Sequence, residues 1–368
     1  MSNFEVTVLG ASGGTDGGAT QCFMVRPMGC RGLRSICVDG GAGFSQISQM
    51  LARSKDSFKS ELLESFYAND FEPAGQFFDP KASVSLGFPQ CILGSLEDAL
   101  EKHKHLNTFT KAMEIYMGVK EYYITHAHLD HIGAMVLNSP FACDANSGDA
   151  KLICALPFTL QAIEKHIFND VIWPDLLHGG SSRLKLSSLT DGIPHVCGAF
   201  PQWDIIPFKV HHGFSASIVD ERVYSTVYLF SDRSTKQSLL VCGDLEPDSA
   251  SGGEPLLEKA WEYIATRVPR GNLKGIIVEC SSSASTPKHE LYGHMSPAYL
   301  VGQLSRLREM YGDPDVLAGL SILVTHVKTI ISEKDPRLVI LQELREAALQ
   351  ERLDVRFSMA VQGYTFSF

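Results

Sequence analysis

Residues 126–140 read HAHLDHIGAMVLNSP and directly follow the apolar run Tyr122–Thr125. His126 and His128 are two residues apart in this stretch. On extended chain both imidazoles therefore point the same way and can share one metal ion. Since Tyr122–Thr125 has the composition of a buried strand, the pattern predicts a metal site that begins where this strand ends.

The same stretch supplies ligands for a second metal ion. Asp130 continues on the side of the two histidines, and His131 turns back as the chain enters a helix expected over Ile132–Leu137. An isolated His-x-His pair has little specificity, whereas the pattern HxHxDH is much rarer by chance. The stretch therefore predicts two adjacent metal sites, because a chance occurrence of this pattern is improbable.

Three other apolar runs also lead into metal-ligand residue types. These are Ile205–Val210 before His211 and His212, Leu239–Cys242 before Gly243 and Asp244, and Ile322–Thr325 before His326. In layered α/β proteins, functional groups gather where strands deliver the chain to loops at one edge. The chain has 13 histidines, so one strand-end histidine would mean little, but the repetition predicts one convergent site.

The strand ends can complete both metal sites. The first metal needs a third histidine, the second needs another histidine, and one carboxylate could bridge them. His212 or His211, His326 and Asp244 are available for these positions. Nitrogen and oxygen ligands without a thiolate favour zinc, with manganese and iron as alternatives.

Two further residues are candidates outside the ligand set. His294 lies just before the helix expected to begin at Ser296-Pro297, and hydrolysis of a phosphodiester at a metal pair needs a proton donor for the departing alkoxide. The alternative for His294 is a loop histidine bonded to the backbone. Asp39 lies in a glycine-rich turn, where it either orients a ligating imidazole or serves the turn itself.

The rest of the chain favours one compact α/β domain over residues 1–368. Short strands with glycine-rich turns fill the first 45 residues, and an insertion at about 46–118 is expected to cover the site. Later strands alternate with helices expected over 157–168, 254–267, 296–311 and 335–351. The last two helices have good starts, with Ser296 and Asp335 as capping residues before a first-turn proline.

The composition excludes some classes of protein. The chain has 368 residues with 32 Lys and Arg against 42 Asp and Glu, a formal charge of −10. This acidic balance argues against a protein that grips a nucleic-acid backbone. No apolar run is long enough to span a membrane, and Glu5 lies where a signal peptide would be apolar. We therefore expect no nucleic-acid partner, no membrane and a cytoplasmic location.

The motifs resemble those of the class II cyclic nucleotide phosphodiesterases. The likeness in residues 126–140 extends beyond HxHxDH to the trailing apolar run and Asn-Ser-Pro. Similar segments run from end to end of the chain, namely Val6–Gly14, Val38–Gly43, Phe168–Asp175, Ile206–Gly213, Val241–Asp244, Val278–Ser281 and Val324–Lys328. The chain thus resembles a whole family member rather than a borrowed module.

The resemblance implies an α/β protein of the metallo-β-lactamase fold, an αββα four-layer sandwich of two mixed sheets with outer helices. By similarity to the tRNA 3′-end nucleases of that fold, it also implies the role of each site residue. His126, His128 and His212 would hold one metal, Asp130, His131 and His326 the other, with Asp244 as the bridge. His294 matches the proposed general acid of those nucleases.

The implied function is hydrolysis of cyclic AMP, and of cyclic GMP as a second substrate, to the 5′-monophosphate, which ends cyclic nucleotide signalling. A hydroxide shared by the two metals would attack phosphorus while His294 protonates the 3′ oxygen, with His294 and Asp130 as the expected catalytic residues. Rival functions are an RNA 3′-processing nuclease, a thioester, lactone or β-lactam hydrolase, and a non-catalytic cyclic nucleotide sensor. The expected partner is a small cyclic nucleotide, and a homodimer through residues 46–118 stays open.

Overall fold

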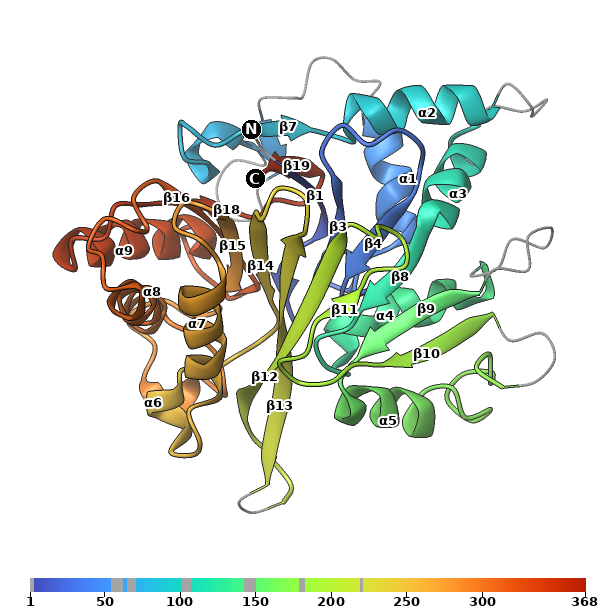
Figure 1. The fold of residues 1–368 in the computed structure, drawn as a ribbon. Helices are drawn as coiled ribbons and strands as arrows, with labels where there is room; N and C mark the ends of the chain where they lie inside the picture. Colours follow the sequence, from blue (N-terminus) through green and yellow to red (C-terminus); the bar gives the residue numbers. More distant parts are fainter. Residues whose placement is uncertain are drawn as a thin grey trace.

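Two β-sheets pack face to face, and helices cover the outer side of each sheet (Figure 1). The computed structural model describes residues 3–53, 62–64, 71–100, 107–141, 150–178, 183–218 and 221–368. Figure 1 places α1 to α5 on one side of the sandwich and α6 to α9 on the other. The arrangement is the αββα sandwich that the sequence predicts. None of the helices in the described ranges is long and apolar enough to cross a bilayer.

The first sheet is mixed, with antiparallel pairing at one end and parallel pairing at the other. Its eight strands are, in spatial order, β10 (Leu184–Ser188), β9 (Lys151–Ala155), β8 (Val119–Tyr123), β4 (Ser35–Val38), β3 (Cys22–Pro27), β1 (Phe4–Gly10), β19 (Tyr364–Ser367) and β7 (Val84–Leu86). The four strands from β4 to β10 run parallel. Strands β1, β3, β19 and β7 pair in the antiparallel sense.

The second sheet is mixed in the same way. Its seven strands are, in spatial order, β11 (His195–Val196), β12 (Trp203–Phe214), β13 (Arg222–Asp232), β14 (Ser238–Cys242), β15 (Leu273–Glu279), β16 (Leu320–Thr325) and β18 (Val355–Met359). Strands β14, β15, β16 and β18 are parallel neighbours. Two small pairs stand apart, β2 (Ser12–Gly13) with β17 (Val327–Lys328) and β5 (Leu62–Glu64) with β6 (Phe71–Pro73).

Helices connect the strands on both outer faces. The α-helices are α1 (Phe44–Arg53), α2 (Gln90–Leu100), α3 (Thr108–Gly118), α4 (Leu129–Asn138), α5 (Pro157–His166), α6 (Asp248–Ser251), α7 (Leu256–Arg267), α8 (Pro297–Tyr311) and α9 (Pro336–Gln350). Short 3₁₀ turns are η1 (Ala74–Phe77), η2 (Ser139–Phe141) and η3 (Lys288–Glu290). Parallel strands need such crossover helices, which is why they flank the parallel halves of both sheets.

Aromatic side chains join the inner faces of the two sheets. The ring of Phe4 on β1 lies 5.1 Å from that of Trp203 on β12. Tyr123 on β8 similarly lies 5.9 Å from Phe230 on β13. All four side chains are fully buried. Because strand residues alternate between faces, the neighbouring Glu5 and Thr7 point away from this core. The interior between the sheets is thus apolar and well buried, and it fixes the strand ends that carry the site.

Helices α1, α2 and α3 of residues 46–118 pack on the outside of the first sheet rather than over the site, whereas Ala74, Phe77 and Phe78 join the core cluster that contains Phe4 and Trp203. Ile47 of α1, Ile92 of α2 and Ile115 of α3 join a second apolar cluster with sheet residues such as Met24 and Tyr122. The sequence suggested a cover over the site because this stretch combines mixed polar, helix-like segments with an aromatic segment. The apolar faces of the three helices instead complete the outer layer of the sandwich. The aromatic residues 66 and 67 of this stretch lie outside the described residues.

Several boundaries differ from the predicted ones. β8 ends at Tyr123 and α4 already begins at Leu129, so His126 lies in a short loop between them. β12 continues to Phe214, so His211 lies within the strand rather than beyond its end. The four helices predicted after residue 150 are present. Asp335 caps its helix by accepting a hydrogen bond from the Arg337 backbone at 2.9 Å, whereas the Ser296 side chain makes no cap bond.

Candidate metal centre

The candidate centre draws its side chains from both sheets. His126 and His128 lie in the loop after β8, and Asp130 and His131 lie in the first turn of α4. The second sheet supplies His212 from β12, Asp244 from the loop after β14, and His326 from the residue after β16. The sequence therefore predicted correctly that these seven residues meet.

A close backbone contact fixes the start of α4. The Gly40 amide donates to the His131 carbonyl at 2.6 Å, and the Met135 amide donates to the Gly40 carbonyl at 2.8 Å. A Cβ atom on Gly41 would lie only 1.9 Å from the Asp130 carbonyl oxygen. Glycine is therefore required in the turn after β4, because only glycine lets this turn approach the helix so closely.

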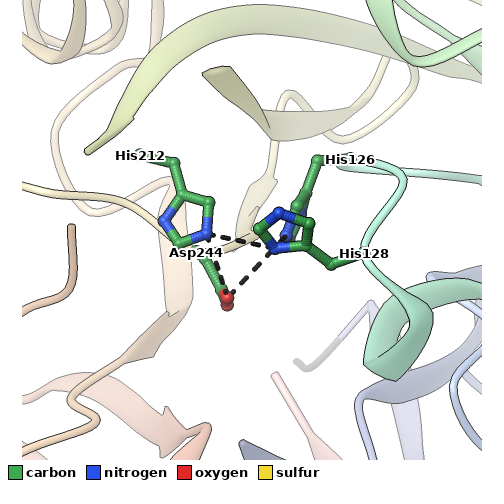
Figure 2. Close-up of side chains that lie close together, drawn as sticks. All are labelled: His126, His128, His212 and Asp244. Carbon is green, nitrogen blue, oxygen red and sulfur yellow. Dashed lines mark hydrogen bonds and ion pairs between the residues drawn. The ribbon is translucent and has the colours of Figure 1, made fainter. Parts of the chain in front are cut away.

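The first cluster consists of three imidazoles and one carboxylate that point toward one another (Figure 2). His128 Nδ1 lies 2.9 Å from His126 Nε2 and 3.4 Å from His212 Nε2. Asp244 Oδ2 lies 3.8 Å from His126 Nε2 and 3.7 Å from His212 Nε2. Three imidazole nitrogens and a carboxylate oxygen in this arrangement match the ligand types of a tetrahedral zinc site.

The second cluster consists of two imidazoles and two carboxylates. His326 Nε2 lies 3.2 Å from His131 Nε2 and 3.3 Å from Asp130 Oδ2. Asp244 belongs to this cluster as well, with its Oδ1 at 3.2 Å from His326 Nε2 and its Oδ2 at 3.3 Å from His131 Nε2. Asp244 thus lies between the two clusters and is the one side chain that they share.

Hydrogen bonds on the outer side of the rings turn lone pairs toward the centre. The Nδ1 atom of His131 faces Asp39 Oδ2 at 2.8 Å, and that of His212 faces the Gly293 carbonyl at 2.9 Å. Both partners only accept, so each Nδ1 carries the proton and each Nε2 presents its lone pair inward.

Hydroxyl groups orient the other two imidazoles, those of His126 and His326, so that Nε2 faces the centre. Thr125 Oγ1 donates to Asp39 and lies 3.1 Å from His126 Nδ1, from which it can accept. Ser281 Oγ donates to Glu279 and lies 3.1 Å from His326 Nδ1. Asp39 thereby supports His131 directly and His126 through Thr125. Orienting bonds of this kind are typical of metal-ligating histidines.

The donor set fits a divalent cation and is unfavourable without a positive charge. The His131 and His326 Nε2 atoms face each other at 3.2 Å, and both lie beside the buried Asp244 carboxylate. The buried Asp244 Oδ1 has no hydrogen-bond donor among the described residues. A buried oxygen without a donor costs free energy, and so does a buried carboxylate charge that no cation pairs with. A shared cation removes both penalties, so the two clusters suggest divalent metal binding.

Burial keeps the three imidazoles of the first cluster neutral. Burial lowers the pKa of His126 and His128, and it lowers the pKa of His212 to about 4. These imidazoles are therefore unprotonated at neutral pH, which is the form that binds a metal. Burial also acts to raise the pKa of Asp244, but the nearby His326 and His131 outweigh it and hold that pKa well below its usual value. The carboxylate is thus ionised.

Of the two neighbouring histidines on β12, only His212 points into the cluster. His211 Nε2 lies 2.8 Å from the Glu254 carbonyl, on the other side of the strand. The pairing of β12 with β13 is irregular between His211 and Phe214. Because strand residues alternate, such an irregularity decides which face each side chain takes. The sequence motif by itself left this choice open.

A buried carboxylate that the sequence analysis missed holds His294. Glu279, at the end of β15, is fully buried, and its Oε1 lies 2.9 Å from His294 Nδ1. The Glu279 carboxylate also accepts from the backbone amides of Leu245 and Met295 and from the Ser281 hydroxyl. Burial acts to lower the pKa of His294, but the charge of Glu279 outweighs it and raises that pKa. The only sequence signal was a lone Glu after an apolar run.

Comparisons with known proteins agree with this geometry. The family model of the class-II cAMP phosphodiesterases matches residues 36–363. The 3′,5′-cyclic-nucleotide phosphodiesterase 1 of Saccharomyces cerevisiae is 44% identical over 368 residues, which cover 99% of each chain. The crystal structure of unliganded yeast PDE1 covers both chains completely with a TM-score of 0.95 and 43% identity. A metallo-β-lactamase fold protein from Bacillus subtilis covers both chains with a TM-score of 0.53 and 14% identity.

Proposed function

Because this chain belongs to the class-II cAMP phosphodiesterases, has the metallo-β-lactamase fold and hydrolyses 3′,5′-cyclic nucleotides, we propose that its two side-chain clusters hold two divalent cations for this reaction. One cation would be held by His126, His128 and His212, the other by Asp130, His131 and His326, with Asp244 as a ligand of both. Zinc suits these ligands, with manganese and iron as alternatives.

One observation carries this assignment. Six metal-ligand side chains from three segments of the chain meet around the shared Asp244, and four of their imidazoles have Nε2 turned inward by outer hydrogen bonds. Core histidines normally use both nitrogens for hydrogen bonds within the protein. Here the inner nitrogens face only one another and carboxylates, which is the arrangement that a cation pair needs.

Removal and return of metal tests the assignment. Dialysis against a chelator should abolish hydrolysis of cyclic AMP, because the cations supply charge neutralisation at the phosphate and make hydroxide available near neutral pH. Zinc, manganese or iron(II) is then added back separately, and metal content is measured by elemental analysis. We expect full recovery at two ions per chain. Recovery at one ion per chain, or full activity in chelator, would contradict the proposal.

His294 is the proposed proton donor for the leaving 3′ oxygen. Its ring centroid lies 5.0 Å from that of His212 and 5.3 Å from that of His326, so it borders both clusters. Glu279 binds the Nδ1 side of the ring, which leaves Nε2–H available to the substrate. The proton passes from Nε2 to the 3′ oxygen as its bond to phosphorus breaks, and the imidazole stays bound to Glu279.

Glu279 positions this donor and stabilises its protonated form. Since Glu279 raises the pKa of His294, Glu279→Gln should lower that pKa, so His294 loses its proton at lower pH. We expect the alkaline limb of kcat to move down by about 1 pH unit or more, with kcat about 10-fold lower. Glu290→Gln, an exposed carboxylate on η3, is the matched control. An unchanged pH profile would show that Glu279 is structural only.

The family assignment favours hydrolysis of cyclic nucleotides over the alternatives that the sequence left open. An RNA 3′-processing nuclease would need a basic surface, and the formal charge here is −10. A non-catalytic sensor would have no use for a proton donor held by a buried carboxylate. Cyclic AMP and cyclic GMP both remain predicted substrates, and the homodimer and the cytoplasmic location stay predictions.

A further inference from the structure

The tight turn that carries His294 also displays an aromatic ring. Tyr292 lies two residues before His294, and 73% of its surface is exposed. The turn is closed by the His294 amide, which donates to the Leu291 carbonyl at 3.1 Å. Leu291 itself is buried, so the turn is anchored on one side while the Tyr292 ring faces outward.

Tyr292 adopts a backbone conformation that a bulky residue rarely takes. Its φ is 51°, and that of Gly293 is 82°, so both central residues of the turn are left-handed. Asn, Asp and Gly normally occupy such positions because side chains with a bulky Cβ substituent are strained there. Tyrosine is therefore unfavourable for the turn itself, and such strain is typical of functional sites.

The turn is fixed against the metal centre. The Gly293 carbonyl accepts the hydrogen bond from His212 Nδ1 at 2.9 Å. A Cβ atom on Gly293 would lie 2.7 Å from the His212 carbonyl and the Gly213 amide. The backbones of this turn and of β12 are thus in direct contact, so the backbone of Tyr292 keeps a defined position beside the strand that carries His212.

A cation lies over this ring. Lys328 Nζ is 5.7 Å from the centre of the Tyr292 ring, and Lys328 lies on β17, two residues after His326. None of the ion pairs found among the described residues involves Lys328. The ammonium group attracts the electron-rich face of the ring, which leaves the opposite face for another planar group.

We propose that Tyr292 is the stacking surface for the base of the cyclic nucleotide, with Lys328 holding the ring from its other face. The inference rests on the proposed role of His294 at the 3′ oxygen. In the substrate, the base is attached to C1′ of the same ribose ring that carries this oxygen on C3′. A flat ring two residues from the proton donor is therefore within reach of the base, and aromatic stacking tolerates adenine and guanine alike.

Kinetics on two substrates test the proposal. Tyr292→Ala should raise KM for cyclic AMP by about 5- to 100-fold and leave kcat nearly unchanged, since stacking contributes to binding. KM for a base-free substrate, the 3′,5′-cyclic phosphate of 1-deoxyribose, should not change. Tyr292→Phe keeps the ring and should retain KM. Lys328→Gln should raise KM for cyclic AMP by a smaller factor.

A second variant separates loss of the ring from distortion of the turn. Asparagine tolerates the left-handed conformation, so Tyr292→Asn keeps the turn but lacks the ring, and it should raise KM as Tyr292→Ala does. An equal KM increase on both substrates, or an effect of Tyr292→Ala that Tyr292→Asn does not share, would overturn the inference. If His294→Ala left turnover intact while Tyr292→Ala still raised KM for cyclic AMP alone, the result would support Tyr292 as the stacking surface. It would contradict His294 as the proton donor.

Discussion

Replacing Asp244 with asparagine is expected to reduce kcat for cyclic AMP by about 10³-fold or more. Asp244 is the side chain common to both clusters, and its substitution removes a negative charge between the two proposed cations. Losing one cation removes several kcal/mol of charge stabilisation, and each ~1.4 kcal/mol corresponds to a tenfold change in rate. Elemental analysis of the variant should find fewer than two ions per chain.

The design of this experiment separates metal loss from unfolding. Asparagine has nearly the shape of aspartate, so a thermal melt should show a folded variant. Asp315→Asn, an exposed position after α8, is the matched control and should retain activity and metal. If Asp244→Asn kept two ions and turnover within tenfold of the unsubstituted enzyme, Asp244 could not be the shared ligand.

The second large effect is expected at His294. His294→Ala removes the proposed proton donor and should lower kcat for cyclic AMP by about 10²- to 10⁴-fold. Two ions per chain should remain bound, because His294 is outside the proposed ligand set. His289→Ala, five residues earlier with an exposed side chain, is the matched control and should leave kcat unchanged.

The leaving group gives a sharper version of the same test. A p-nitrophenyl phosphodiester releases a stable phenolate that needs no proton, so His294→Ala should hydrolyse it at nearly the rate of the unsubstituted enzyme. An equal loss on both substrates would show that His294 acts on metal binding or positioning rather than as an acid. Asp244→Asn, in contrast, should lose activity on both.

The sequence predicted the parts of the fold that follow from local patterns. Continuous apolar runs gave the strands of the parallel halves, because such strands are buried on both faces. Ser296-Pro297 and Asp335-Pro336 marked the starts of α8 and α9, although only Asp335 caps through its side chain. The meeting of the seven candidate ligands was predictable because each lies at or near the end of a buried strand.

Other features depend on contacts that no local pattern encodes. Glu279 reads as one more acidic residue after an apolar run, and only the folded chain places it against His294. The choice between His211 and His212 depends on an irregular pairing of β12 with β13. Helices α1 to α3 of residues 46–118 join the outer layer through packing against β3 and β8, which the mixed composition of this stretch did not indicate.

The origin of the candidate ligands links chemistry to folding. His126 and His128 come from the first sheet, whereas His212, Asp244 and His326 come from the second. On the proposed assignment, each cation is a cross-link between the two halves of the sandwich. Binding energy at the ions then adds to the free energy of unfolding in proportion to the logarithm of free metal concentration. The free concentration of the metal ion would then determine the stability of the sandwich as well as the rate of the reaction.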